Sequence, residues 1–252
     1  MDSETATLLD TAEIPAGLKT ALQELLGSAD QFLPALNSHV QARYRYYLNR
    51  IVKEACDPAL DLLWWETILH LIRKAASEAG EAGQPFIAAA GRLVPLMQAH
   101  LGPDGPVEFR PVTDDNVIPV CRLSETLAPP QIYMVAPNAI SLAQALVNPN
   151  AWYRAIYTGR TLVGFIMLSD NAEEPEYFLW RFMVAAPYQG RGYGAAAIQL
   201  LVDYVRTRPG ARELLVSCGE GAGSPRGFYE RQGFVSTGEV IDDELVLKMP
   251  LM

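Results

Sequence analysis

Residues 182–194 read Phe182-Met183-Val184-Ala185-Ala186-Pro187-Tyr188-Gln189-Gly190-Arg191-Gly192-Tyr193-Gly194, an apolar run that leads into a glycine-rich turn. The turn opens directly into a predicted helix, residues 195–206. The first N–H groups of a helix have no intrahelical partner, and together with the helix dipole they favour a bound phosphate. The three glycines let the backbone approach a ligand closely and adopt unusual φ values. This order of strand, turn and helix predicts an anion site.

The glycine turn has partial similarity to two further classes of phosphate loop. Gly190-x-Gly192-x-x-Ala195 fits the dinucleotide fingerprint with alanine last, which requires an acidic residue at the end of the next strand. The next predicted strand, residues 213–218, ends in Cys218, and a Walker loop would need Gly-Lys-Ser/Thr, which the sequence lacks. A tight turn without a ligand stays open as an alternative, because short motifs also occur by chance.

A second motif lies about 35 residues downstream and favours a ligand-binding turn over a turn without a ligand. Residues 189–194 fit the pattern [QR]-x-x-G-x-[GA], and residues 228–234 read Phe-Tyr-Glu-Arg-Gln-Gly-Phe. These two motifs, in this order, resemble the pyrophosphate loop and the F/L-Y-x-x-x-G-F helix of the GCN5-related N-acetyltransferases (GNAT). Residues 163–167, Val-Gly-Phe-Ile-Met, match the hairpin strand of that superfamily. Residues 177–183 resemble the aromatic strand of its bacterial spermine/spermidine (diamine) acetyltransferase branch, which the chain resembles most closely.

The resemblance covers about residues 107–252 and implies an α+β fold, with a mixed, mostly antiparallel sheet flanked by helices. The residue pattern agrees with this expectation. Alternation and turn signals predict strands at 107–112, 177–183, 213–218 and 240–249, a hairpin from 152–157 and 161–169, and a helix at 140–147. Ser224 and Pro225 are suited to open a short helix that Gly233 ends.

The resemblance also implies acetyl-CoA as the cosubstrate and no metal. The pyrophosphate is expected on residues 189–194, and the pantetheine arm on freed backbone groups of the strand before them. Tyr229 holds the position of the family tyrosine beside the coenzyme sulfur, and Ser224 stands where the family usually has asparagine. A phenol with a pKa of about 10 is protonated at neutral pH, so Tyr229 is the expected general acid for the leaving thiolate. The expected cofactor-binding residues are Phe182, Met183, Val184, Gln189, Gly190, Arg191, Gly192, Tyr193, Gly194 and Ser224.

The amine substrate is less defined. Some polyamine acetyltransferases place a glutamate four residues before the position of Val184, and this chain has Trp180 there. Glu174 and Glu176 precede the strand and are the expected substrate contacts, with a solvated acidic loop as the alternative. The predicted function is N-acetylation of a small amine by direct transfer, and the resemblance implies a polyamine. Acetylation of an aminoglycoside or a protein N-terminus, or non-catalytic acyl-CoA sensing, are the alternatives.

The first hundred residues have a different pattern and resemble no family. Apolar residues at helical spacing predict helices at residues 14–26, 30–54, 58–79 and 85–101, with Pro95 as a kink or break in the last. Gly102-Pro103-Asp104-Gly105-Pro106 excludes helix and strand alike. We therefore expect two domains, an α-helical domain of unknown role at residues 1–102 and an acetyltransferase domain at residues 107–252.

Composition narrows the class of partner. The net charge of −9 is unsuited to the phosphate backbone of nucleic acid and suits a cationic substrate. Three widely spaced cysteines and three histidines form no metal motif, and no signal peptide or membrane span is visible. The cytoplasm is the expected location. A small-molecule amine is the expected partner and a homodimer is left open, with neither nucleic acid nor a membrane expected.

Overall fold

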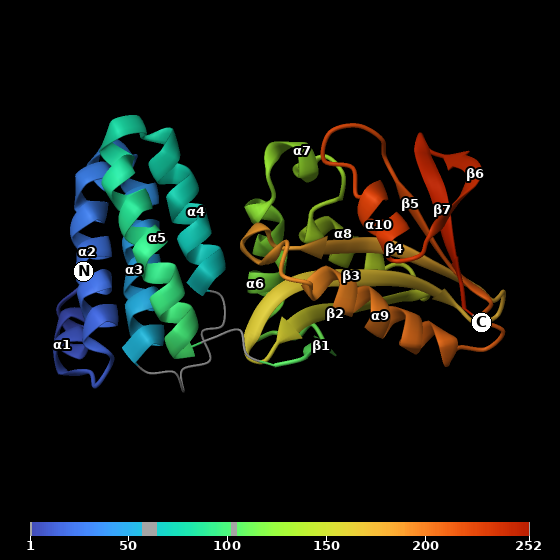
Figure 1. Ribbon diagram of the computed structural model, residues 1–252, viewed down its shortest axis with the longest axis horizontal. Coiled ribbons are helices and arrows are strands. Elements are labelled where there is room, and N and C mark those ends of the chain that lie inside the picture. Colours follow the sequence, from blue (N-terminus) through green and yellow to red (C-terminus); the bar gives the residue numbers. More distant parts are fainter. Residues whose placement is uncertain (1, 57–64, 102–104, 252) are drawn as a thin grey trace. The chain divides into compact units, whose positions relative to one another are not determined.

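The computed structural model describes residues 2–56, 65–101 and 105–251. These residues divide into two compact units, Met1–Asp104 and Gly105–Met252, which are described separately (Figure 1).

The first unit is helical. Its elements are α1 (Ser3–Thr11), α2 (Ala16–Phe32), the 3-10 turn η1 (Leu33–Ala35), α3 (Ser38–Cys56), α4 (Trp65–Glu78), the 3-10 turn η2 (Gly80–Gly83) and α5 (Gln84–Leu101). Asp2 caps α1 by accepting a 2.7 Å hydrogen bond from the Thr5 N–H. Apolar faces of the helices bury one core, in which the rings of Phe32 and Phe86 lie 5.1 Å apart. Burial of these faces stabilises the helices against the entropy of ordering the chain.

Several helix boundaries differ from the sequence expectation. The helix predicted from residue 30 is wrong at its start, because α2 continues to Phe32 and Pro34 then stands in a 3-10 turn before α3 begins at Ser38. Proline has no N–H and its ring clashes with the preceding turn, so it separates the two helices here. Pro95, in contrast, lies inside α5 without ending it. The start of the helix predicted at 58–79 lies outside the described residues.

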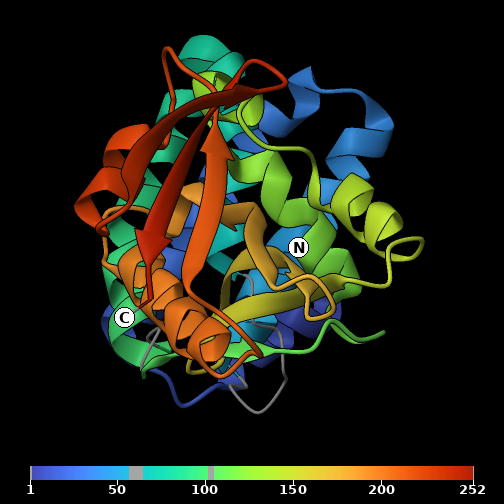
Figure 2. The ribbon, with the colours of Figure 1, turned by 90° about the vertical axis from the view of Figure 1, so that its right-hand side faces the viewer.

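The second unit contains one seven-stranded sheet. Its strands are β1 (Val107–Arg110), β2 (Ala151–Thr158), β3 (Thr161–Asn171), β4 (Glu176–Val184), β5 (Glu213–Cys218), β6 (Val235–Ile241) and β7 (Glu244–Pro250). They lie in the order β1-β2-β3-β4-β5-β7-β6, and all neighbours are antiparallel except β4 and β5. Figure 2 shows the twist of this sheet. The predicted mixed, mostly antiparallel sheet flanked by helices is confirmed.

Five helices accompany the sheet. They are α6 (Val117–Arg122), α7 (Pro129–Ile132), α8 (Asn138–Ala145), α9 (Tyr193–Arg206) and α10 (Arg226–Arg231), with 3-10 turns η3 (Leu123–Thr126) and η4 (Ala186–Tyr188). The single strand predicted at residues 240–249 is wrong, because Asp242 and Asp243 form the turn of a hairpin between β6 and β7. These two residues have φ values of 51° and 64°, a left-handed conformation that aspartate tolerates and that two-residue hairpins require.

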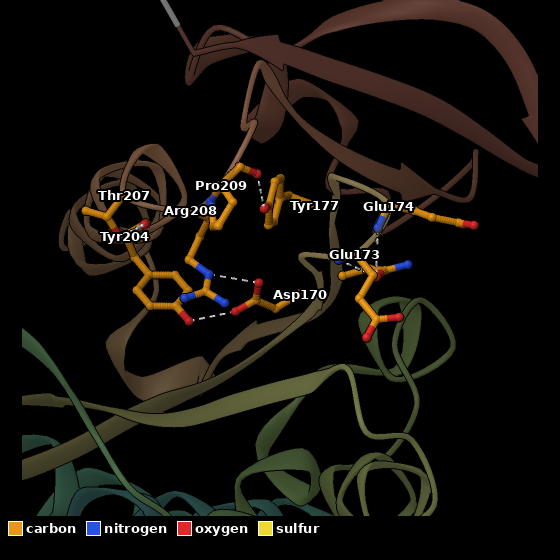
Figure 3. A network of polar contacts seen from close by, with 9 residues as sticks. Asp170, Glu173, Glu174, Tyr177, Tyr204, Thr207, Arg208 and Pro209 are labelled. Carbon is orange, nitrogen blue, oxygen red and sulfur yellow. Dashed lines mark hydrogen bonds and ion pairs between the residues drawn. The ribbon is translucent and has the colours of Figure 1, made fainter.

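The C-terminal end of α9 is tied to β3 by a polar network (Figure 3). The Asp170 carboxylate accepts hydrogen bonds from the Tyr204 hydroxyl at 2.7 Å and from Arg208 Nε at 2.9 Å. The Tyr177 hydroxyl donates to the Pro209 carbonyl at 2.6 Å, and the Tyr204 ring stacks on Trp152 with centroids 4.4 Å apart. These contacts hold α9 at a fixed place relative to the sheet.

The pairing of β4 creates an opening in the sheet. β4 pairs with β3 from Glu176 to Val184, but its described pairing with β5 is confined to Phe178 with Leu215 and Leu179 with Val216. After these two pairs the strands separate, and the backbone of residues 180–184 is released from β5. A register shift against β3 skips Trp180, which is therefore a β-bulge at the start of the split.

Candidate active site

The glycine turn has the conformation that its sequence requires. Gly190 and Gly192 have φ values of 75° and 87°, and Gly192 is the N-cap of α9. A Cβ at either position would meet nothing within 4 Å, so space is open beside this backbone. Gly194 is constrained differently, because a Cβ there would lie 3.3 Å from the Phe228 ring. The turn that leads into α9 thus borders free space, as an anion site at this helix start needs.

A cavity of about 610 Å³ lies beside this turn, between the end of β4 and the start of α10. Its volume is within the usual range of ligand pockets. Nine of the residues expected from the sequence line it together: Phe182, Met183, Val184, Gln189, Gly190, Gly192, Gly194, Ser224 and Tyr229. The structure therefore brings the glycine turn, the split strand and the tyrosine motif to one cavity.

Four expected residues are not among those that line the cavity. The Arg191 guanidinium lies over the Tyr188 ring, 5.7 Å from its centroid, and Tyr193 is the first residue of α9. Glu174 lies in the turn between β3 and β4 (Figure 3). Glu176 is the first residue of β4, at the other end of the strand from the split. At about 3.3 Å per residue, Glu176 and Phe182 are separated by about 20 Å along β4. The structure does not bring these two carboxylates to the cavity.

Gln189 organises the turn through its side chain. Its Nε2 donates to the Val184 carbonyl at 2.9 Å and to Gln131 Oε1 at 3.2 Å, while Gln131 Nε2 donates to Gln189 Oε1 at 3.1 Å. The first bond ties the turn to the end of β4, and the other two tie it to α7. The Gln189 side chain therefore shapes the turn, while its backbone N–H donates to the Ala186 carbonyl at 3.3 Å.

The α7 segment forms a wall of the cavity that sequence reasoning missed. Leu127, Gln131, Met134 and Val135 all line it. This segment packs tightly on the loop after β5, since a Cβ at Gly223 would lie 2.6 Å from the Pro130 carbonyl carbon. No motif in the segment indicated this role, because its position depends on contacts with residues almost a hundred positions away.

Tyr229 is held in a dry, aromatic environment. Only 4% of the residue is exposed, and its ring meets those of Phe228 and Phe234 at 5.4 and 5.5 Å between centroids. Burial raises the pKa of Tyr229, and the neighbouring Cys218 and Glu244 raise it further. The phenol is therefore neutral at physiological pH and available as a proton donor.

The Ser224 hydroxyl forms hydrogen bonds with the backbone around it. Its Oγ donates to the Gly219 carbonyl at 2.6 Å and accepts a hydrogen bond from the Arg226 N–H at 3.3 Å. The helix begins at Arg226 and not at Pro225, which is its N-cap. Ser224 therefore lines the cavity while its hydroxyl bonds the loop before α10.

A polar cluster lies on the opposite face of the sheet from α9. Arg181 points to this face, because its Nη2 donates to Gln144 Oε1 of α8 at 3.2 Å. Ser217 of β5 donates to the carboxylate of Glu244, the first residue of β7. Burial lowers the pKa of Arg181, and the Glu244 charge opposes that shift. The same charge adds to the rise that burial causes in the pKa of Tyr229. The sequence contains no local signal for this cluster.

Within residues 2–56, 65–101 and 105–251, no group of His, Cys, Asp and Glu is arranged to hold a metal ion. No helix in these ranges is long and apolar enough to cross a membrane.

Part of the chain is similar to known acetyltransferases. Residues 122–234 match the acetyltransferase (GNAT) family, and no curated protein matches the chain. A Desulfovibrio desulfuricans structure assigned to the GNAT acetyltransferases is 23% identical, with 58% of this chain and 99% of that chain covered and a TM-score of 0.48. A chimera of the spermidine N-acetyltransferase SpeG from Vibrio cholerae and hSSAT is 15% identical, with coverages of 58% and 96% and a TM-score of 0.46.

A PaiA N-acetyltransferase from Thermoplasma acidophilum, solved in complex with coenzyme A, is also similar. It is 15% identical, with 57% of this chain and 98% of that chain covered and a TM-score of 0.44. The family match includes the glycine turn, the split strand and Tyr229. The chain is thus similar to the acetyltransferase (GNAT) family over residues 122–234.

Proposed function

We propose that this protein transfers the acetyl group of acetyl-CoA directly to the nitrogen of a small amine. The observation that carries the proposal is the single cavity in which the Gly190–Gly192 turn, the released end of β4 and Tyr229 meet. The open space beside both glycines suits a pyrophosphate, and the cavity volume of about 610 Å³ suits a pantetheine arm. Residues 107–252 contain every part of this site, and we propose them as the acetyltransferase domain.

Acetyl-CoA supplies an activated thioester, and the chain supplies groups for each proton and charge. The amine nitrogen forms a bond to the carbonyl carbon, the C–S bond breaks, and the sulfur leaves as a thiolate. We assign the stabilisation of negative charge on the carbonyl oxygen to those backbone N–H groups of residues 182–184 that face away from β3, because β5 does not pair them. Tyr229 gives its proton to the thiolate, and the proton lost by the nitrogen restores the phenol through solvent.

Direct transfer is favoured over a covalent acetyl-enzyme. Cys218 is the cysteine within electrostatic reach of Tyr229, and it is buried at the end of β5. Burial raises the pKa of this thiol, and the Glu244 charge raises it further. The thiolate is the nucleophilic form, so a thiol held protonated is a poor acceptor of the acetyl group.

Three features of the protein bear on the chemical identity of the acceptor amine. The sequence resemblance to diamine acetyltransferases supports a polyamine, and the net charge of −9 would draw in a cation. Glu174 and Glu176 do not support it from within the cavity, because they lie at the other end of β4. An aminoglycoside or a protein N-terminus are alternative acceptors. The three free cysteines are our reason to propose the cytoplasm as the compartment.

The experiment that tests the proposal measures release of free thiol from acetyl-CoA with a panel of amines. Turnover with any amine, together with an N-acetylated product seen by mass spectrometry, is the expected result. Binding of coenzyme A by calorimetry without turnover of any amine would favour an acyl-CoA-sensing module. Loss of both binding and turnover would contradict the proposal altogether.

A further inference from the structure

Arg181 is a half-buried cation that forms no direct ion pair with a carboxylate of the described residues. Its Nη1 donates to the Trp180 carbonyl at 2.8 Å, its guanidinium lies 5.3 Å from the Trp180 ring centroid, and its Nη2 donates to Gln144. Its Nε is buried, and no described residue offers it a hydrogen-bond acceptor. Burial of a charge without a partner is costly, and it lowers the pKa of Arg181.

The strand register places this cation across the split from a carboxylate. Phe178 pairs with Leu215, and the bulge at Trp180 returns Arg181 to the face of Phe178. On the other side of the split, Ser217 follows Leu215 by two residues and therefore shares that face. Ser217 pairs with Val246, and Glu244, two residues before Val246, lies on the same face.

The acetyl cavity reaches the split from the opposite face. Phe182 stacks on Phe228 of α10 with ring centroids 5.9 Å apart, which places its side chain on the face of α9 and α10. Arg181 is the residue directly before Phe182 and points the other way. An acceptor on the Arg181 face would therefore meet the thioester through the split, next to both Arg181 and Glu244.

We propose that the acceptor is a small amino-carboxylate, whose carboxylate binds Arg181 and whose amine lies between Glu244 and the split. This inference rests on the proposed function and names its substrate class. The planar guanidinium matches a carboxylate with two parallel hydrogen bonds, and each Nη keeps one N–H beyond those that bond Trp180 and Gln144. The Glu244 carboxylate complements the ammonium group and accepts its proton before attack. A polyamine would instead bring a second cation next to Arg181, which like charges disfavour.

The test compares amines that differ only in the anionic group. Standard L-amino acids, β-alanine and γ-aminobutyrate are each assayed beside their carboxamides, with spermidine in the same panel. We expect the wild-type protein to use at least one acid with kcat/KM about 100-fold above its carboxamide, because a site built for a charged group rejects the analogue without it. Arg181→Gln should raise KM for the acid and reduce that preference to nearly one.

Two variants separate this role from a structural one. Arg181→Lys keeps the charge but not the fork, so it should restore part of the preference. Arg206→Gln makes the same chemical change on the exposed surface of α9, where Arg206 pairs with Asp203, and should leave the preference unchanged. Glu244→Gln should lower kcat/KM for acid and carboxamide alike, since both carry the amine.

The possible outcomes separate the substrate class from the acetyltransferase function. Thiol release with spermidine or with carboxamides, at rates equal to or above those of the acids, would overturn the amino-carboxylate while the acetyltransferase function stands. An acid preference that persists unchanged in folded Arg181→Gln and Arg181→Lys would overturn the role of Arg181. The absence of thiol release with every amine would overturn the proposed function and this inference with it.

Discussion

Phe182 of β4 and Phe228 of α10 stack with ring centroids 5.9 Å apart and an interplanar angle of 21°. Phe228 also meets Tyr229 edge to face and lies against the place where Gly194 has no Cβ. One aromatic contact thus joins the split strand, the start of α9 and the helix that carries the proposed acid. Two motifs that are distant in the sequence form one wall of the cavity through this contact.

Tyr229→Phe should lower kcat by about 100-fold with little change in KM for acetyl-CoA, because it removes the donated proton and keeps the ring. Steady-state thiol release measures both constants. Tyr133→Phe is the matched control, since Tyr133 is 84% exposed and does not line the cavity. A kcat near that of the wild type would remove Tyr229 from the mechanism, unless product release limits the rate.

The pH profile should rise toward alkaline pH, because only the neutral amine attacks. Burial raises the pKa of Tyr229, so the acid form of this group persists above its ordinary pKa of about 10. We therefore expect kcat/KM to follow the ionisation of the amine and to show no fall below about pH 10 from loss of the Tyr229 proton. A descending limb near neutral pH that disappears in Tyr229→Phe would contradict the raised pKa.

Gly192→Asp should lower the affinity for coenzyme A by about 100-fold, or 2.7 kcal/mol, because it places a negative charge where phosphate is expected. Gly192→Asn is the matched control, since asparagine has nearly the same size and tolerates the positive φ of 87° as well as aspartate does. Calorimetric titration of coenzyme A should show a smaller loss for asparagine. Equal affinities for the two variants would mean that no phosphate approaches Gly192.

A fragment of residues 105–252 should fold and bind coenzyme A as the full chain does. This unit contains the whole sheet and the cavity. The fragment begins at Gly105 because the Gly105 carbonyl accepts a 2.8 Å hydrogen bond from Thr158 Oγ1 of β2. Circular dichroism and calorimetry check the two parts of this prediction. An insoluble fragment, or a folded one without affinity, would show that residues 1–104 complete the core or the site.

Tyr204→Phe should destabilise that fragment by about 1–2 kcal/mol at pH 8, because Asp170 loses one of its two hydrogen-bond donors. Burial and the bond to Asp170 raise the pKa of Tyr204 to about 12. A raised tyrosine pKa gives stability that is fully present below the unfolded value of about 10 and is lost as pH rises toward 12. The deficit of Tyr204→Phe should therefore shrink at pH 11.

Urea unfolding of the fragment at pH 8 and pH 11 measures this deficit. Tyr133→Phe is again the control, because an exposed tyrosine should show no pH-dependent difference from the wild type. A deficit that grows at pH 11 would contradict the raised pKa of Tyr204 in the folded protein.

Short sequence patterns were enough to predict the glycine turn and the helix that carries Tyr229, because neighbouring residues determine both. The glycine turn followed from its order between strand and helix, because positive φ at Gly190 and Gly192 is available to few other residues. The short helix with Tyr229 followed from its own motif. The hairpin at Asp242–Asp243 was missed, since two aspartates in left-handed conformation are less frequent than the Asn-Gly signal for such a turn.

The sequence by itself thus determined the family resemblance, the conformation of the glycine turn and the place of Tyr229 on a short helix, because each depends on residues close together in the chain. Only the tertiary structure decided that Arg181 and Glu244 share a face across the split. That relationship depends on the bulge at Trp180 and on the register of β4, β5 and β7, and a shift of one residue in any of them would reverse the face. Contacts between distant strands set this register, and no window of sequence contains them.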